Sequence, residues 1–232
     1  MSDHTSKQFD TELEAVRSSV LQMGGLVEEQ INRAIEALET GDMALIDIVL
    51  ATDKQVNRME VDLDEQCSHI IARRQPAAGD LRLLMTVIKT ITDLERIGDE
   101  AEKIAQMARL IHEANRANMP HVELNHIANA ALAMLRKALD SFARLDAVSA
   151  AQVVRDDIDL DDEYRSIMRQ LITFMMEDPR TISRSIEILF IIRALERIGD
   201  HAKNMSEYTV YMIKGRDVRH ITVDDLQREA SS

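Results

Sequence analysis

The residues of this chain best suited to chemistry sit in two copies of one hexapeptide. Leu-Glu-Arg-Ile-Gly-Asp occupies residues 94–99 and recurs, letter for letter, at residues 195–200. Each copy places a Glu four residues before an Asp, so on a helix the two carboxylates point the same way, a few ångströms apart. Two like charges at this spacing disfavour a helix by a few tenths of a kcal/mol unless something compensates them. The pairs are Glu95 with Asp99 and Glu196 with Asp200.

A second set of pairs lies upstream of each hexapeptide. Asp157 and Asp161 have the same spacing, and the equivalent residues of the first half are Asp53 and Asn57, where an amide replaces one carboxylate. If the helices that carry these residues are neighbours, oxygen-bearing side chains converge in each half. Mg²⁺ and Mn²⁺ prefer such ligands and iron accepts them. The sequence therefore predicts divalent or iron cations at the acidic pairs.

The alternative interpretation of these pairs is a solvated acidic face. Arg96 and Arg197 would then form surface salt bridges of little energetic value. The recurrence of the whole hexapeptide favours a site, because a solvated face does not require the same letters twice. Gly98 and Gly199, each directly before the Asp, remove a side chain and would let an ion or a helix approach closely.

Catalytic chemistry finds little support in the sequence. A ferritin-like di-iron centre needs Glu-x-x-His on two helices, whereas the chain has one such pair, Glu123 and His126, at an expected helix start. The sequence contains no glycine-rich phosphate loop, no G-x-S-x-G and no Cys/His zinc spacing. We therefore expect no catalytic residue, and a metal-dependent oxidase or hydrolase remains the enzymatic alternative.

Long helices must position the acidic pairs. Apolar residues recur at steps of three and four from Phe9 to Leu38, which predicts a helix that packs nearly side by side with its neighbours. Gly24 and Gly25 interrupt this helix and indicate either a close neighbour or a bend. Similar stripes predict five more helices, at about residues 43–74, from residue 80 onward, and at about 123–145, 147–177 and 179–214.

The two halves of the chain repeat each other beyond the hexapeptide. Leu81, Ile88 and Ile91 match Ile182, Leu189 and Ile192 in the register that aligns the hexapeptides. A repeated trio of helices indicates duplication of a three-helix bundle. We therefore predict an all-α fold of two tandem three-helix bundles. The first spans residues 1–116, the second spans residues 117–215 with a linker at 115–121 between them, and a loose tail follows at 216–232.

Composition narrows the class of partner and the compartment. The 232 residues carry a formal net charge of −13 and only 3% aromatic side chains, so the chain lacks the basic charge and the stacking rings that nucleic-acid binding needs. The same charge disfavours direct binding to an anionic membrane surface. Cys67 is the only cysteine, which fits a reducing compartment, and the polar N-terminus has no signal-peptide core. We expect a cytoplasmic protein.

These motifs resemble the PhoU family of phosphate-transport accessory proteins. The resemblance rests on the doubled hexapeptide, on LQMGGLVEEQINRAIEAL at residues 21–38 and on QPAAGDLRLLM at residues 75–85, and it extends from Phe9 to Lys214. It implies two tandem three-helix bundles, a homodimer, and a non-enzymatic adaptor that damps the phosphate-starvation response. It also implies two partners, the ATPase subunit of a phosphate ABC transporter and a sensor histidine kinase, with membrane association only through them.

The resemblance also bears on the acidic pairs. Some members of the family bind metal clusters at motifs of the form Glu/Asp-x-x-x-Asp, which correspond here to Glu95 and Asp99, Glu196 and Asp200, and Asp157 and Asp161. Asp53 and Asn57 depart from that pattern at the second place, so the resemblance implies that a metal site in the first bundle is weaker, holds fewer ions or is missing. Metal storage without signalling partners remains a third hypothesis.

Overall fold

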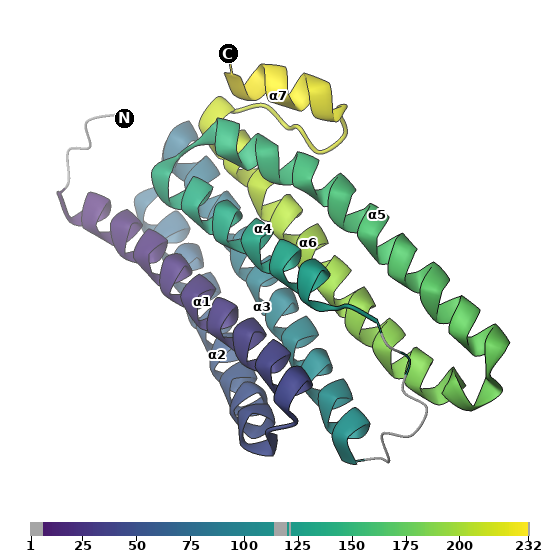
Figure 1. The fold of residues 1–232 in the computed structure, drawn as a ribbon. Helices are drawn as coiled ribbons and strands as arrows, with labels where there is room; N and C mark the ends of the chain where they lie inside the picture. Colours follow the sequence, from purple (N-terminus) through teal and green to yellow (C-terminus); the bar gives the residue numbers. More distant parts are fainter. Residues whose placement is uncertain (1–6, 114–119, 121, 232) are drawn as a thin grey trace.

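The described part of the protein consists of six long α-helices and a short terminal one (Figure 1). The structure, a computed structural model, describes residues 7–113, 120 and 122–231. No strand occurs in these residues, which confirms the all-α prediction. The helices are α1 (Lys7–Thr40), α2 (Met43–Arg74), α3 (Ala78–Glu113), α4 (Asn125–Arg144), α5 (Ala147–Glu177), α6 (Ile182–Lys214) and α7 (Val223–Ser231), with a 3-10 turn η1 (Pro179–Thr181) before α6.

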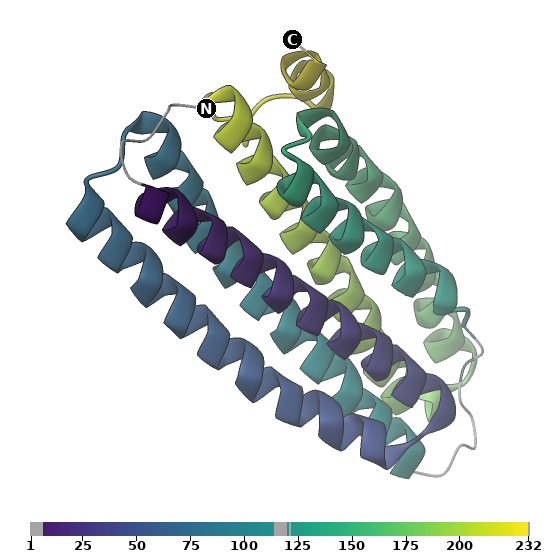
Figure 2. The ribbon, with the colours of Figure 1, turned by 90° about the vertical axis from the view of Figure 1, so that its left-hand side faces the viewer.

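The long helices form two three-helix bundles, as the repeat predicts. Helices α1, α2 and α3 make the first bundle and α4, α5 and α6 the second (Figures 1 and 2). Helix α3 packs along α6, and α1 contacts α4, so α2 and α5 lie at opposite edges. One hydrophobic core runs through both bundles. The expected boundary between residues 116 and 117 lies outside the described residues, as does the expected linker apart from Pro120.

Local sequence sets several helix ends. The side chain of Asp42 accepts a hydrogen bond from the backbone N–H of Ala44, 2.8 Å away, and so caps α2 as expected. Just before it, Gly41 has φ +75° and donates its N–H to the carbonyl of Ala37, which ends α1. Asp178 caps η1 in the same way through the N–H of Arg180. Such interactions involve neighbouring residues alone, which explains why the sequence reveals them.

The paired glycines of α1 serve a close contact between the bundles. Helix α1 continues through both residues without interruption. A Cβ atom at Gly24 would lie 2.4 Å from Cδ2 of Leu139 on α4, whereas a Cβ at Gly25 would have no atom within 4 Å. Of the two readings left open by the sequence, a close neighbour therefore accounts for Gly24.

The end of the chain differs from the expected loose tail. Helix α7 covers the start of α5 and lies beside the end of α6 (Figure 1). Leu226 is 1% exposed, and it belongs with Val218, Ala150 and Val154 to a small apolar cluster of its own. The apolar residues of α7 recur at steps of three and four, Val223, Leu226 and Ala230, which is the spacing of an amphipathic helix. This short apolar stripe predicts a helix, although the mixed charge of the segment suggests a loose tail.

Candidate metal centre

Three carboxylates of the first bundle meet between α2 and α3. One oxygen each from Asp53, Asp99 and Glu102 lies within 4.8 Å of the other two, and we call these residues the first acidic cluster. Asp53 is on α2 and is 6% exposed, while Asp99 and Glu102 lie on α3 and are half-buried. Glu95 lies one turn before Asp99 on the same helix, outside this group of three. Three such oxygens suit a hard divalent cation.

Two neutral amides hold the buried carboxylate of this cluster. The amide nitrogen of Gln30 on α1 donates to Oδ1 of Asp53 at 3.4 Å, and that of Asn57 donates to Oδ2 at 3.2 Å. Gln30 is fully buried. The amide oxygens of Gln30 and Asn57 are buried and have no hydrogen-bond partner among the described residues. Two orphaned acceptors beside three carboxylates form a set of oxygens that a cation would satisfy, because buried acceptors otherwise cost free energy.

Gly98 lets this polar group close against α3. A Cβ atom there would lie 3.2 Å from Oε1 of Gln30 and 3.5 Å from Oδ1 of Asp53. The glycine of the hexapeptide thus keeps a side chain away from oxygens that belong to α1 and α2. On these observations the residues present in the first bundle fit a divalent cation.

Burial and mutual repulsion raise the pKa values of carboxylates in and beside the first acidic cluster. Burial raises the pKa of Asp53, an effect that the hydrogen bond from Gln30 opposes and the charge of Asp99 reinforces. The pKa of Glu95 is raised mainly by burial and next by the negative charge of Asp99. The pKa of Glu102 is raised mainly by burial and next by the negative charge of Asp53. Negative charge in a poorly solvated place favours either protons or a cation.

The corresponding carboxylates of the second bundle are arranged differently. Asp157 on α5 is 5% exposed, and its Oδ2 accepts a hydrogen bond from the ammonium of Lys203 on α6 at 2.6 Å. Burial is the largest single effect and lowers the pKa of this lysine, but the hydrogen bond to Asp157 and the negative charges of Asp157, Glu207 and Asp200 together outweigh it, so the pKa is raised. Around Asp157 lie Asp161, Glu196 and Asp200, and we call these four residues the second acidic cluster. Among the described residues, no three of its carboxylates converge as those of the first cluster do.

Arginines engage two further carboxylates of the second acidic cluster. Asp161 pairs with Arg165 at 3.1 Å, and Oε1 of Glu196 accepts from Arg193 at 2.6 Å. Glu196 is 7% exposed and its Oε2 is buried without a partner in the described part of the chain. Burial and, next, the charge of Asp200 raise the pKa of Glu196 to about 7.

Sequence reasoning identified most of these residues and missed two that decide the arrangement. Glu102 completes the first acidic cluster, and Lys203 neutralises Asp157 in the second. In the register that aligns the hexapeptides, these two residues occupy the same position of the repeat. The signal was available, since Glu102 lies three residues after Asp99 on the same helical face. The expectation of a poorer site beside Asn57 also missed that its amide supports Asp53.

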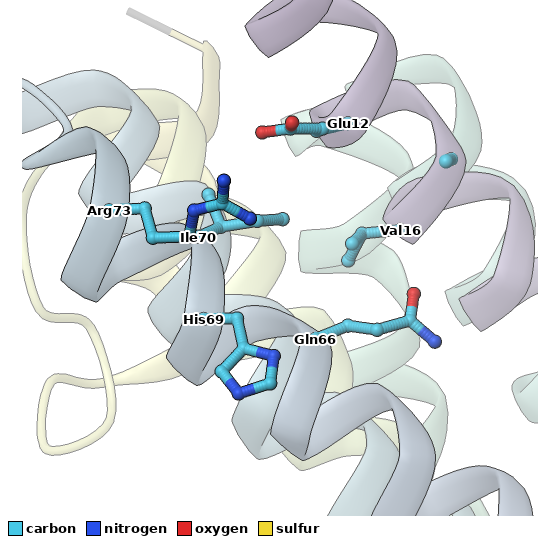
Figure 3. A pocket seen from close by; sticks show the side chains of 7 residues that line it. Glu12, Val16, Gln66, His69, Ile70 and Arg73 are labelled. Carbon is cyan, nitrogen blue, oxygen red and sulfur yellow. The ribbon is translucent and has the colours of Figure 1, made fainter.

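The other candidate features lie apart from these clusters. In the Glu-x-x-His motif, Glu123 accepts a hydrogen bond from the backbone N–H of Asn125, and His126 pairs with Glu163. The two side chains of the motif thus have separate partners. A cavity of about 220 Å³ opens between α1 and the end of α2 (Figure 3). His69 and Arg73 of α2 line it opposite Glu12 and Val16 of α1. Arg74 holds Glu12 with two hydrogen bonds, of 3.0 and 2.6 Å.

Comparison with known proteins accounts for the doubled architecture. A model of the PhoU domain matches the chain twice, at residues 20–108 and 124–209. The chain belongs to the PhoU family. Each PhoU domain contains one hexapeptide, one acidic cluster and most of one three-helix bundle.

PhoU proteins of known sequence and structure match this chain over nearly its whole length. The "phosphate-specific transport system accessory protein PhoU homolog" of Pseudomonas aeruginosa is 47% identical over 232 residues, which are 100% of this chain and 96% of that protein. The crystal structure of PhoU from Pseudomonas aeruginosa has a TM-score of 0.86 at 48% identity, covering 90% of this chain and 100% of that one. The phosphate transport system regulatory protein PhoU from Streptococcus pneumoniae has a TM-score of 0.83 at 28% identity, covering 90% and 99%.

The helices of this chain are long, but a membrane span must also be predominantly apolar along its length. Among the described residues, none of them combines the length and the apolar character needed to cross a bilayer. The apolar stripes of α1 to α6 face one another in the shared core instead.

Proposed function

We propose that this protein is a non-enzymatic regulatory adaptor of a phosphate-specific transport system. In this role it restrains the phosphate-starvation response when phosphate is plentiful. The observation that carries the proposal is the match to PhoU proteins from end to end, with both PhoU domains present and named relatives aligned over 96% or more of their length. Two of those relatives are described as an accessory protein and a regulatory protein of phosphate transport.

The proposed partners are the ATPase subunit of the phosphate ABC transporter and a membrane-bound sensor histidine kinase. The protein would act in the cytoplasm as a homodimer and reach the membrane through these partners. A rigid, elongated pair of bundles suits an adaptor, because a shared core fixes the spacing between surfaces on its two edges. The acidic balance of the chain, −13, favours basic surfaces on the partners.

Gene deletion tests the regulatory role. Without the protein, a reporter of phosphate-starvation genes should stay on in phosphate-rich medium, and a wild-type copy should switch it off. Normal repression in the deletion strain would refute the proposal. Pull-down from membranes solubilised in detergent should retain the transporter ATPase and the kinase. Retention of neither, together with normal repression, would favour metal storage.

A divalent cation or iron at the first acidic cluster is the second part of the proposal. The orphaned amide oxygen of Gln30 beside Asp53, Asp99 and Glu102 supports it. The ion would screen the carboxylates from one another and tie α2 to α3. Asp99→Asn should lower the Mn²⁺ or iron retained by the purified protein at least about tenfold, since even indirect changes at metal sites cost 10–100-fold in affinity. Equal metal content in both proteins would return the cluster to an acidic surface.

A further inference from the structure

We infer that the ammonium group of Lys203 is a permanent counter-ion of the second acidic cluster, so that divalent cations bind this protein through its first bundle alone. The inference rests in part on the proposed metal centre, which it deepens by assigning the site to one PhoU domain of the two. It reverses the expectation from the sequence, which placed the weaker site in the first bundle beside Asn57.

Lys203 makes a direct ion pair with the second acidic cluster. Its Nζ lies 2.6 Å from Oδ2 of Asp157, the most buried carboxylate of the second acidic cluster. Asp157 is the repeat partner of Asp53. The lysine therefore bonds the residue whose equivalent in the first bundle belongs to the first acidic cluster. A divalent ion at Asp157 would have to displace this hydrogen bond and then lie beside the ammonium. Like charges a few ångströms apart repel strongly where water is scarce.

Two of the three remaining carboxylates of the second acidic cluster bond basic side chains of their own. Asp161 bonds Arg165, and Glu196 bonds Arg193. In the first acidic cluster, the buried carboxylate of Asp53 accepts hydrogen bonds from the neutral amides of Gln30 and Asn57. The nearest lysine of α3, Lys103, bonds Glu100 instead. The second acidic cluster is thus surrounded by basic side chains, whereas the first is accompanied by amide groups with unpaired oxygens.

The surroundings of the hexapeptide glycines also differ between the bundles, in a way that does not involve charge. The side of α3 at Gly98 faces Oε1 of Gln30, Cγ1 of Val56 and Oδ1 of Asp53. The equivalent side of α6 at Gly199 faces Cδ2 of Leu160 and the thioether of Met134. The three atoms nearest to a Cβ at Gly199 are thus carbons and a thioether sulfur, whereas two of the three nearest to a Cβ at Gly98 are oxygens. A hard cation would find fewer oxygen ligands beside Gly199 than beside Gly98.

Mn²⁺ retention by the full-length protein tests the inference. Each variant is loaded with Mn²⁺, freed of excess by gel filtration and assayed for Mn²⁺ per chain and for the shift of its Tm on adding EDTA. Asp157→Asn should keep the wild-type Mn²⁺ content, whereas Asp53→Asn should lose most of it. Lys203→Glu, which copies the first bundle at this position, should bind additional Mn²⁺ and acquire an extra EDTA-sensitive rise in Tm. Lys214→Glu, the same charge change on α6, should gain neither.

Each outcome separates the inference from the metal-centre proposal. Loss of Mn²⁺ in Asp157→Asn, or a Lys203→Glu protein that binds no more than Lys214→Glu, would overturn the inference and leave the first site in place. A wild type without Mn²⁺ beside a Lys203→Glu variant that binds it would refute the metal centre and support the blocking role of the lysine. If Lys203→Glu fails to fold, Lys203→Gln removes the counter-ion with less strain and should show the same gain.

Discussion

The contact of α1 with α4 can be tested by two neighbouring glycines that the structure treats in opposite ways. Gly24 is buried against Leu139, and Gly25 is exposed with open space around it. Both lie in the interior of α1, so alanine at either position should gain about 0.5–1 kcal/mol from the better helix propensity. This gain is common to the two variants and cancels when they are compared. The difference between them therefore isolates the contact with Leu139.

The magnitude follows from three distances. The new Cβ at residue 24 would lie 2.4, 2.8 and 3.2 Å from Cδ2, Cδ1 and Cγ of Leu139, all shorter than the 3.5–4.0 Å or so at which carbon atoms attract each other best. The whole leucine side chain must move, or α1 and α4 must separate. Overpacking of this kind costs about 1–3 kcal/mol. We expect Gly25→Ala to be stabilised and Gly24→Ala to be about 1–3 kcal/mol less stable than Gly25→Ala.

Urea and thermal unfolding measure this difference. A change of 1 kcal/mol shifts Tm by about 2–4 °C in a protein of this size. Leu139→Ala provides the control, because in that background Gly24→Ala has room and should lose its penalty relative to Gly25→Ala. Equal stability of the two alanine variants would refute the reasoning, as would a penalty at residue 24 that persists without the leucine.

Three further outcomes are expected. Because the pKa of Glu196 is raised from 4.5 to about 7 in the folded protein, the free energy of unfolding should fall as pH rises through that interval; Glu196→Gln should therefore be more stable than wild type at pH 8 but not at pH 5, as thermal melts in EDTA can show. Burial raises the pKa of Cys67 to about 12, so its thiol should react with a disulfide reagent only after urea unfolding, and fast reaction in the native state would contradict its burial. Leu226→Ala should lower stability by up to about 2–5 kcal/mol and speed amide exchange in α7 more than in α3, whereas uniform exchange would mean that α7 does not open by itself.

The candidate site was only partly accessible from the sequence. Spacing along one helix placed Glu95 with Asp99 and Glu196 with Asp200, because residues four apart share a helical face. The upstream pairs proposed Asp53 of α2 and Asp157 of α5 as their neighbours, but spacing does not decide which carboxylates of neighbouring helices meet. That choice depends on how each helix is rotated about its axis, and the rotation is fixed by packing of the whole bundle. As a result, Glu102 belongs to the first acidic cluster, whereas Glu95, which the spacing had paired with Asp99, lies outside it.

The sequence by itself determined the six long helices, the duplication and the family. Apolar steps of three and four, capping residues such as Asp42 and Asp178, and a repeated hexapeptide are all local features that act within a few residues. Only the tertiary structure decided that the two acidic clusters differ. Lys203 reaches Asp157 across the space between α6 and α5, and Gln30 reaches Asp53 from α1. Such contacts join residues far apart in the chain, so they arise from the packing of helices and leave no periodic trace in the sequence.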